Sequence, residues 1–163
     1  MKKPPILSAV DTERQASADH VVTQVDTRFL ESLMGYNARR ASLAIIGRFM
    51  AQMAVYDLRV VDFSVLSLIT HNPGITSRQL CSTLGLLPPN LVGMINAMEK
   101  RGLIERQPHP VDRRAVGLHL SNAGRDLMAK AEVTASQLER DATAKLTATE
   151  TRTLLRLLRK IYL

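Results

Sequence analysis

The chain has 163 residues, enough for one domain with its hydrophobic core and for extra helices that a partner would cover. Its 22 lysines and arginines outnumber 15 acidic residues, and the formal charge of +7 favours a polyanionic partner, whether DNA, RNA or an anionic membrane. Trp is absent, with three Phe and three Tyr, which argues against single-stranded nucleic acid stacked on aromatic platforms.

No apolar run approaches the ~20 residues that span a bilayer, and the first residues lack the apolar segment of a signal peptide. We therefore expect a cytoplasmic protein that does not act in a membrane. The single cysteine, Cys81, excludes an intramolecular disulfide, which suits a reducing compartment.

Residues 1–26 are polar, contain Pro4 and Pro5, and are expected to form a flexible arm. A long helix is predicted over residues 27–56, because apolar residues recur near helical spacing, although Gly35 and Gly47 weaken that prediction. These residues are Leu30, Leu33, Met34, Ile45, Ile46, Phe49, Met50 and Met53. A second helix is predicted from Val60 to about Thr70, where "HNPG" ends it.

The third predicted helix begins with a capping box, in which the Thr76 hydroxyl accepts from the amide of Gln79 and the Gln79 side chain returns to Thr76. Gly85 suits the left-handed position that ends this helix. The side chains expected to face the core are Leu80, Cys81 and Leu84.

The fourth predicted helix has two faces. Pro88 and Pro89 fit its first turn, and an inward stripe follows at Leu91, Met94, Ile95 and Met98. Helical spacing places Pro89, Gly93, Asn96 and Lys100 on the opposite face, with Asn90 at its flank. Such a face fits a major groove, because Asn can pair with adenine N6 and N7, Lys can reach phosphate or guanine, and Gly permits close approach. A merely solvated polar face is the alternative.

A β-hairpin is predicted next, because Gly102 ends the helix, Leu103 and Ile104 begin a strand, and "VGLHL" alternates as the returning strand. Its tip is basic. Arg106, Arg113 and Arg114 would lie at its base and end, where arginine can enter a narrow minor groove. Asp112 is expected to orient a neighbouring guanidinium group. The alternative is a surface hairpin with an incidental ion pair.

Residues 58–128 resemble the winged-helix core of the MarR (multiple antibiotic resistance regulator) family of bacterial transcription factors. The most specific parts are "MEKRGLIER", the wing motif Asp112-Arg113-Arg114, and the step from Leu120 to Gly124. With the flanking helices, the resemblance covers roughly residues 27–163. It implies a mainly α fold with a small β-hairpin wing, in which a winged helix-turn-helix core is flanked by long dimerisation helices.

The resemblance also implies a homodimer on double-stranded DNA, with the fourth helix in a major groove and the wing, through Arg114, in the adjacent minor groove. Two half-sites about one turn apart require a twofold partner, so we expect a pseudo-palindromic operator. The predicted division is residues 57–120 as the DNA-binding lobe and residues 27–56 and 121–163 as the dimerisation region. Thr76, Ser77 and Arg78, at the start of the third helix, complete the predicted DNA-binding set.

Two terminal helices are predicted, from Ser121 to about Ala142 and from Thr147 to Leu163, with Ser121 and Thr147 as N-caps. The last one carries more apolar residues than a short solvated helix should expose, which favours packing on the other subunit over a self-contained core helix. They are Leu154, Leu155, Leu157, Leu158 and Ile161.

The chain departs from the family pattern at three places. Relatives often carry a basic residue at the position of Gly93 and Arg at that of Ala97, so base recognition is expected to depend more on Asn90, Asn96 and DNA shape. Cys81 is not at the position of the family's peroxide-sensing cysteines, which argues against redox sensing.

Many relatives bind small aromatic acids or phenols between the dimer helices and the DNA-binding lobe. The matching candidates here are Tyr36, Arg39, Arg40, Thr70 and His71. An arginine would hold a carboxylate, and His71 or Tyr36 would bond a ring substituent. Alternatively, the arginines form surface or dimer ion pairs and His71 caps its helix.

The sequence does not favour an enzyme. It lacks a Gly-rich phosphate loop, the spacing of a metal site and a nucleophile with an evident base, and no cofactor is expected. We therefore expect a dimeric repressor released by a small aromatic acid or phenol. The alternative is an architectural or constitutive DNA-binding protein that needs no ligand.

Overall fold

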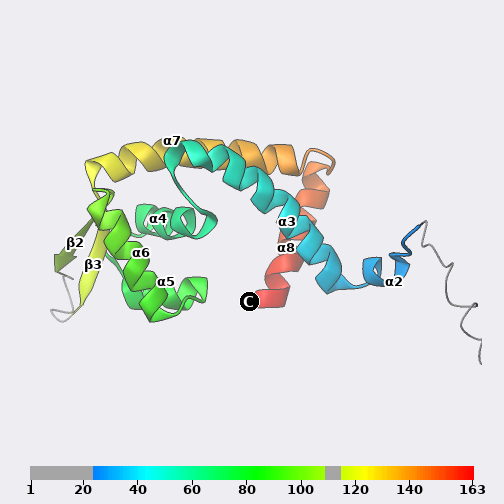
Figure 1. The fold of residues 1–163 in the computed structure, drawn as a ribbon, viewed down its shortest axis with the longest axis horizontal. Coiled ribbons are helices and arrows are strands. Elements are labelled where there is room, and N and C mark those ends of the chain that lie inside the picture. The colour runs from blue at the N-terminus through cyan, green and yellow to red at the C-terminus, as the bar shows by residue number, and fades with distance from the viewer. Residues whose placement is uncertain (1–23, 109–114) are drawn as a thin grey trace, which may run out of the picture. The chain divides into compact units, whose positions relative to one another are not determined.

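The computed structural model describes residues 24–108 and 115–163 (Figure 1). Most of the residues expected to form the flexible arm, and the wing tip with Asp112, Arg113 and Arg114, lie outside this range. The contacts divide the chain into two units, residues 1–39 and 40–163. As predicted, the fold is mainly helical with a small antiparallel sheet.

The first unit contains α2 (Arg28–Glu31) and the start of α3 (Met34–Met53). The prediction of one helix over residues 27–56 is wrong in detail, because the helix is interrupted at Ser32 and Leu33 and ends in a 3-10 turn, η1 (Ala54–Tyr56). One side chain bonds the backbone carbonyl groups at the interruption. Asn37 Nδ2 donates to the carbonyl oxygens of Glu31 and Leu33 at 2.7 and 2.8 Å. Such side-chain bonds offer the backbone an alternative to a continuous helix.

The second unit contains a winged helix (Figure 1). Its elements are α4 (Val60–His71), β1 (Ile75–Thr76), α5 (Ser77–Leu84), α6 (Pro88–Lys100), β2 (Ile104–Pro108) and β3 (Val116–Leu120). The sheet order is β1-β3-β2, and all pairs are antiparallel. Strand β1 was not predicted, because two residues are too few for a periodic pattern. It forms beside β3, where Gly74 N–H donates to the carbonyl oxygen of Leu118 at 2.9 Å.

The core of the second unit lies between α4, α5, α6, α7 and the sheet. The predicted inward stripe of α6 is confirmed, since Leu91, Ile95 and Met98 are buried and Met94 is partly buried. Cys81 packs against this core, and Leu80 beside it is fully buried. The helix pair α5 and α6 is therefore fixed by its apolar residues, and the opposite side of α6 is left exposed.

Three helices of this unit begin where the sequence predicts. The hydroxyls of Thr76, Ser121 and Thr147 each accept a hydrogen bond from the amide three residues later, at 3.3, 3.0 and 3.2 Å. At α8 (Ala148–Tyr162) the backbone and side chain of Thr147 also donate to Glu150, which holds the pKa of that carboxyl below its usual value. Gly85 and Gly102 have φ of 63° and 70°, so both occupy the left-handed region at a helix end.

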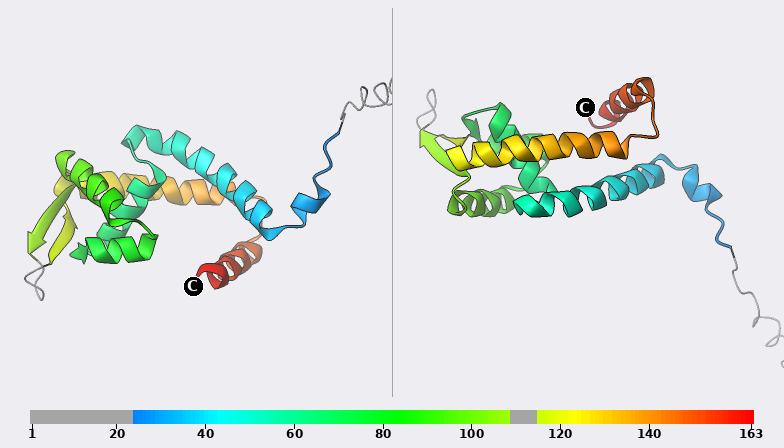
Figure 2. Two further views of the ribbon diagram at one scale, coloured as in Figure 1. Left: turned by 60° about the horizontal axis from the view of Figure 1, so that its bottom comes forward. Right: turned by 90° about the horizontal axis from the view of Figure 1, so that it is seen from above.

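Helix α7 (Asn122–Ala142) follows the wing and runs past α4 (Figures 1 and 2). Gly124, in its first turn, touches the backbone of Leu103: a Cβ at this position would lie 2.0 Å from the Leu103 carbonyl oxygen. Farther along, Thr134 and Tyr56 share a hydroxyl hydrogen bond of 2.9 Å, and Arg48 donates to the carbonyl oxygen of Asp141 at 3.2 Å. These bonds connect α7 with α3 and with η1.

Two helices of the second unit leave their apolar side chains exposed. Helix α8 buries none of its residues, and Met53 is the buried residue of α3. The exposed apolar side chains, 38–64% accessible, are Leu43, Ile45, Ile46 and Met50 on α3 and Leu154, Leu155, Leu157 and Ile161 on α8. Among the described residues, no helix has the length and apolar character needed to cross a membrane.

Candidate nucleic-acid interface

The exposed side of α6 carries the predicted recognition residues. Pro88 and Pro89 occupy its first turn, where their missing N–H groups leave no bond unmade. The residues on this exposed side are Pro89, Asn90, Gly93, Asn96 and Lys100. The structure therefore brings these five predicted residues together on one helix.

Gly93 has no packing reason to be glycine. A Cβ built at this position meets no other atom within 4 Å, although glycine inside a helix costs roughly 0.5–1 kcal/mol relative to alanine. The absent side chain therefore leaves room at the helix surface for a group from outside the protein.

The start of α5 lies next to the start of α6. Ser77 and Arg78 are exposed and line one apolar hollow with Pro88 and Val92. Thr76 is placed differently, since its hydroxyl and amide are both engaged with Gln79 in the predicted capping box. Thr76 thus has a structural role, whereas Ser77 and Arg78 remain available to a ligand beside α6.

Arg106 on β2 contacts α6. Its Nη2 donates to Asn96 Oδ1 at 2.6 Å, and its Nη1 lies 3.2 Å from Glu99 Oε2. Because side chains alternate along a strand, Arg106 is on the same face of β2 as buried Ile104. The sequence predicts Arg106 at the base of the hairpin, but residue spacing alone does not indicate these contacts.

The two strands that lead to the wing tip are in register up to the pair Pro108 and Val116. The predicted minor-groove residues Asp112, Arg113 and Arg114 lie between them, outside the described part of the chain. Their roles stay predictions.

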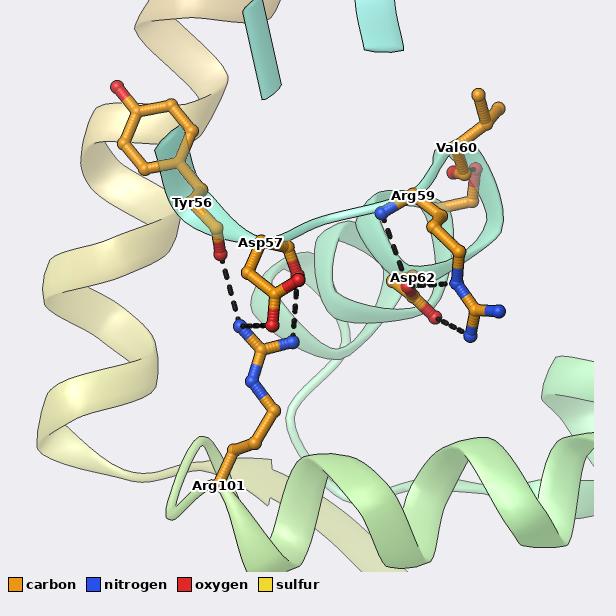
Figure 3. A network of polar contacts seen from close by, with 7 residues as sticks. Tyr56, Asp57, Arg59, Val60, Asp62 and Arg101 are labelled. Carbon is orange, nitrogen blue, oxygen red and sulfur yellow. Dashed lines mark hydrogen bonds and ion pairs between the residues drawn. The ribbon is translucent and has the colours of Figure 1, made fainter. Parts of the chain in front are cut away.

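Arg101, at the end of α6, binds the segment between η1 and α4 (Figure 3). Its guanidinium donates to the carbonyl oxygens of Asp57 and Tyr56 at 2.8 and 3.0 Å. Asp57 has φ of 51°, which is uncommon for a residue other than glycine. Two residues after Asp57, Arg59 donates through its backbone N–H and its guanidinium to Asp62, and this hydrogen bonding raises the pKa of Arg59. Arg101 belongs to the "MEKRGLIER" motif, but this network was not predicted from the sequence.

The predicted ligand residues are distributed over both units. Tyr36 and Arg39 belong to the first unit, Arg40 begins the second, and Thr70 and His71 are neighbours in the last turn of α4. Of these five residues, the structure thus places Thr70 and His71 beside each other.

Both of these α4 residues have partners within the protein. The Thr70 hydroxyl donates to the carbonyl oxygen of Leu66 at 2.8 Å, and His71 Nε2 lies 2.9 Å from Glu132 Oε1 on α7. Ser67 donates to the same carboxylate oxygen at 3.2 Å. Glu132 was not predicted, and its distance along the chain gave no local signal. Within the described ranges, no cluster of three or more His, Cys, Asp or Glu could hold a metal ion.

Comparisons with known proteins agree with this geometry. The MarR family model matches residues 58–116. The structure of the transcriptional repressor CouR bound to a 23-mer DNA duplex is 36% identical with a TM-score of 0.79, and the match covers 85% of this chain and 99% of CouR. A CouR structure bound to p-coumaroyl-CoA is 34% identical with a TM-score of 0.73, covering 85% of this chain and 96% of that one.

A relative from Thauera aromatica, described as a putative transcriptional regulatory protein for the hcr operon, is 28% identical over 130 residues, which are 79% of this chain and 78% of the relative. The fold, the family model and the identity to CouR agree on one assignment. This chain belongs to the MarR family and is a winged-helix, DNA-binding transcriptional regulator.

Proposed function

We propose that this protein is a homodimeric repressor that binds a pseudo-palindromic operator and is released by an aromatic acid or phenolic compound. The observation that carries the proposal is the exposed side of α6, where Asn90, Asn96 and Lys100 surround the vacant Cβ position of Gly93. Polar donors around a close-approach point suit the edges of bases in a major groove. CouR, which was solved on a DNA duplex, supports this reading.

On the protein side, the proposed DNA interface has three parts. Helix α6 enters the major groove, the start of α5 with Ser77 and Arg78 approaches the phosphate backbone, and the wing enters the minor groove through Arg114. Thr76 acts indirectly by capping α5. Arg113 and Asp112 would complete the wing, the first by binding phosphate and the second by orienting a guanidinium group.

The dimer is proposed from the exposed apolar side chains of α3 and α8. Eight of them are more than a third accessible, and a folded monomer rarely leaves so much apolar surface in water. We assign residues 27–56 and 121–163 to the dimerisation region, residues 57–120 to the DNA-binding lobe, and residues 1–26 to an arm. A twofold dimer would present two copies of α6 to half-sites about one helical turn apart.

The proposed effector is an aromatic carboxylate or phenol, free or as its CoA thioester. CouR bound to p-coumaroyl-CoA supports the thioester form, because that ligand combines a phenol with an acyl-CoA. Arg39 and Arg40 would attract its carboxylate or phosphates, and Tyr36, Thr70 and His71 would contact the ring. Since His71 already bonds Glu132, a phenol that binds there would compete for the Glu132 carboxylate.

DNA binding is tested by selecting sequences from a random duplex library and then measuring fluorescence anisotropy on the selected site and on a scrambled one. We expect much tighter binding to the selected site. Equal affinity would favour the architectural alternative.

The effector is tested by adding benzoate, hydroxycinnamates and their CoA thioesters to the protein–DNA complex. Release by at least one compound class is expected. If none of them shifts the affinity, the protein is a constitutive regulator.

A further inference from the structure

The Arg106 side chain contacts Asn96 on the exposed side of α6. One guanidinium group spans two residues of this helix that are three positions apart, with Nη2 at Asn96 Oδ1 and Nη1 at Glu99 Oε2. Both contacts are compatible with the fork geometry of arginine. The base of the wing is thereby connected to the centre of the recognition helix.

The chemistry of the pair identifies which end of the Asn96 amide faces Arg106. A guanidinium group carries five N–H donors and no acceptor, so the amide atom against it must be the oxygen. The Asn96 amide therefore cannot rotate by 180° without placing its NH2 group against a cation. Glu99 strengthens this orientation, because its carboxylate holds the other Nη atom of the same guanidinium.

This orientation changes the base that Asn96 can recognise. The familiar pairing of asparagine with adenine uses the amide oxygen to accept from N6 and the amide nitrogen to donate to N7. Here one lone pair of Oδ1 is engaged with Arg106 at 2.6 Å, and the oxygen is turned toward that cation. Within the described part of the chain, the part of the amide that makes no bond to the protein is the Nδ2 amine, which only donates. Guanine presents two acceptors, O6 and N7, on its major-groove edge, so it matches a donor better than adenine does.

Resting on the proposed DNA-binding role of α6, we propose that Arg106 is a positioning residue that makes Asn96 a donor and directs it to guanine instead of adenine. Glu99 holds the guanidinium on α6 and keeps it from serving mainly as a phosphate contact. This assignment replaces the adenine pairing that the sequence alone predicts for Asn96.

The test is in vitro selection from a random duplex library with the full-length wild type, Asn96→Ala and Arg106→Ala, followed by anisotropy on duplexes that differ at one base pair per half-site. Asn96→Ala identifies the base pair that Asn96 contacts, because selectivity should be lost there. At that pair the wild type should prefer guanine roughly tenfold, and Arg106→Ala should shift the preference toward adenine. Thermal unfolding confirms that both variants are folded.

Two results would overturn the inference. One is a wild-type preference for adenine at the base pair identified by Asn96→Ala. The other is an Arg106→Ala variant that binds all duplexes more weakly by the same factor and keeps its guanine preference, as expected for a lost phosphate contact. Failure of the proposed function gives a different result, namely a wild type that selects no sequence at all.

Discussion

The guanidinium of Arg101 donates to the carbonyl oxygen of Asp57 at 2.8 Å and so connects the end of the recognition helix to the turn between η1 and α4 (Figure 3). The carbonyl oxygen of Tyr56, the last residue of η1, accepts a second hydrogen bond from the same guanidinium, and the Tyr56 hydroxyl shares a hydrogen bond with Thr134 on α7. The C-terminal end of α6 is thus attached to the helices that flank the DNA-binding lobe.

Replacing Arg101 should destabilise this attachment. Because two charge-assisted hydrogen bonds are lost from a side chain that is one-third exposed, we expect Arg101→Ala to lower the free energy of unfolding by about 1–2 kcal/mol. Urea unfolding at fixed protein concentration measures this change in the free energy of unfolding. Arg101→Lys keeps the charge but loses the forked pair of N–H donors, so its free energy of unfolding should lie between those of the wild type and Arg101→Ala. An alanine variant as stable as the wild type would show that the contact contributes nothing.

Gly93→Ala should separate stability from DNA binding. The added methyl group meets no protein atom, and alanine favours a helix interior, so the free energy of unfolding should rise by about 0.5–1 kcal/mol. The same methyl group should weaken DNA binding if the helix approaches bases at Gly93. Anisotropy titrations check this second effect, and unchanged affinity would place the close approach elsewhere on α6.

Gly124→Ala, in contrast to Gly93→Ala, should lower the free energy of unfolding. Its Cβ would lie 2.0 Å from the carbonyl oxygen of Leu103, a backbone atom that cannot move without separating α7 from β2. We expect the free energy of unfolding to fall by about 1–3 kcal/mol or more, as for overpacked core sites, with a lower yield of folded protein. Thermal unfolding of the two glycine variants side by side gives a matched comparison. Equal stability of both would contradict the packing described here.

The apolar surface of α8 predicts how dimerisation responds to mutation. Leu155 is 48% exposed in the single chain, and covering its two copies in a twofold dimer would contribute roughly 1.5 kcal/mol or more. Leu155→Gln should therefore raise the dimer dissociation constant at least tenfold, as measured by analytical ultracentrifugation. Arg156→Gln on the same helix is the control and should change it little. A wild type that remains monomeric at micromolar concentration would refute the proposed dimer.

Local signals in the sequence predicted most of the winged helix. The capping residues Thr76, Ser121 and Thr147 and the stripe of α6 each act within a few neighbouring positions, so a sequence pattern is enough to find them. The motif around Gly124 was recognised from the family resemblance. The structure explains why glycine stands there, because its Cα lies against the backbone of Leu103.

The features that were missed depend on partners farther away. Strand β1 exists because β3 pairs with it, and the Glu132 partner of His71 lies 61 positions away on α7. The contact of Arg106 with Asn96 joins a strand to a helix, and no pattern of residue spacing in the sequence predicts it. For this reason the sequence predicts candidate residues of the interface but not the contact between Arg106 and Asn96 Oδ1.

The most direct test of the account is the affinity of the full-length protein for its selected operator relative to a scrambled duplex, measured by anisotropy at 50 and 200 mM salt. Sequence-specific binding through α6 and the wing predicts a ratio of at least about 10³ at the higher salt, with Arg114→Ala binding more weakly and showing a shallower salt dependence. Equal affinity for the two duplexes, or an Arg114→Ala variant with wild-type affinity and salt slope, would contradict it.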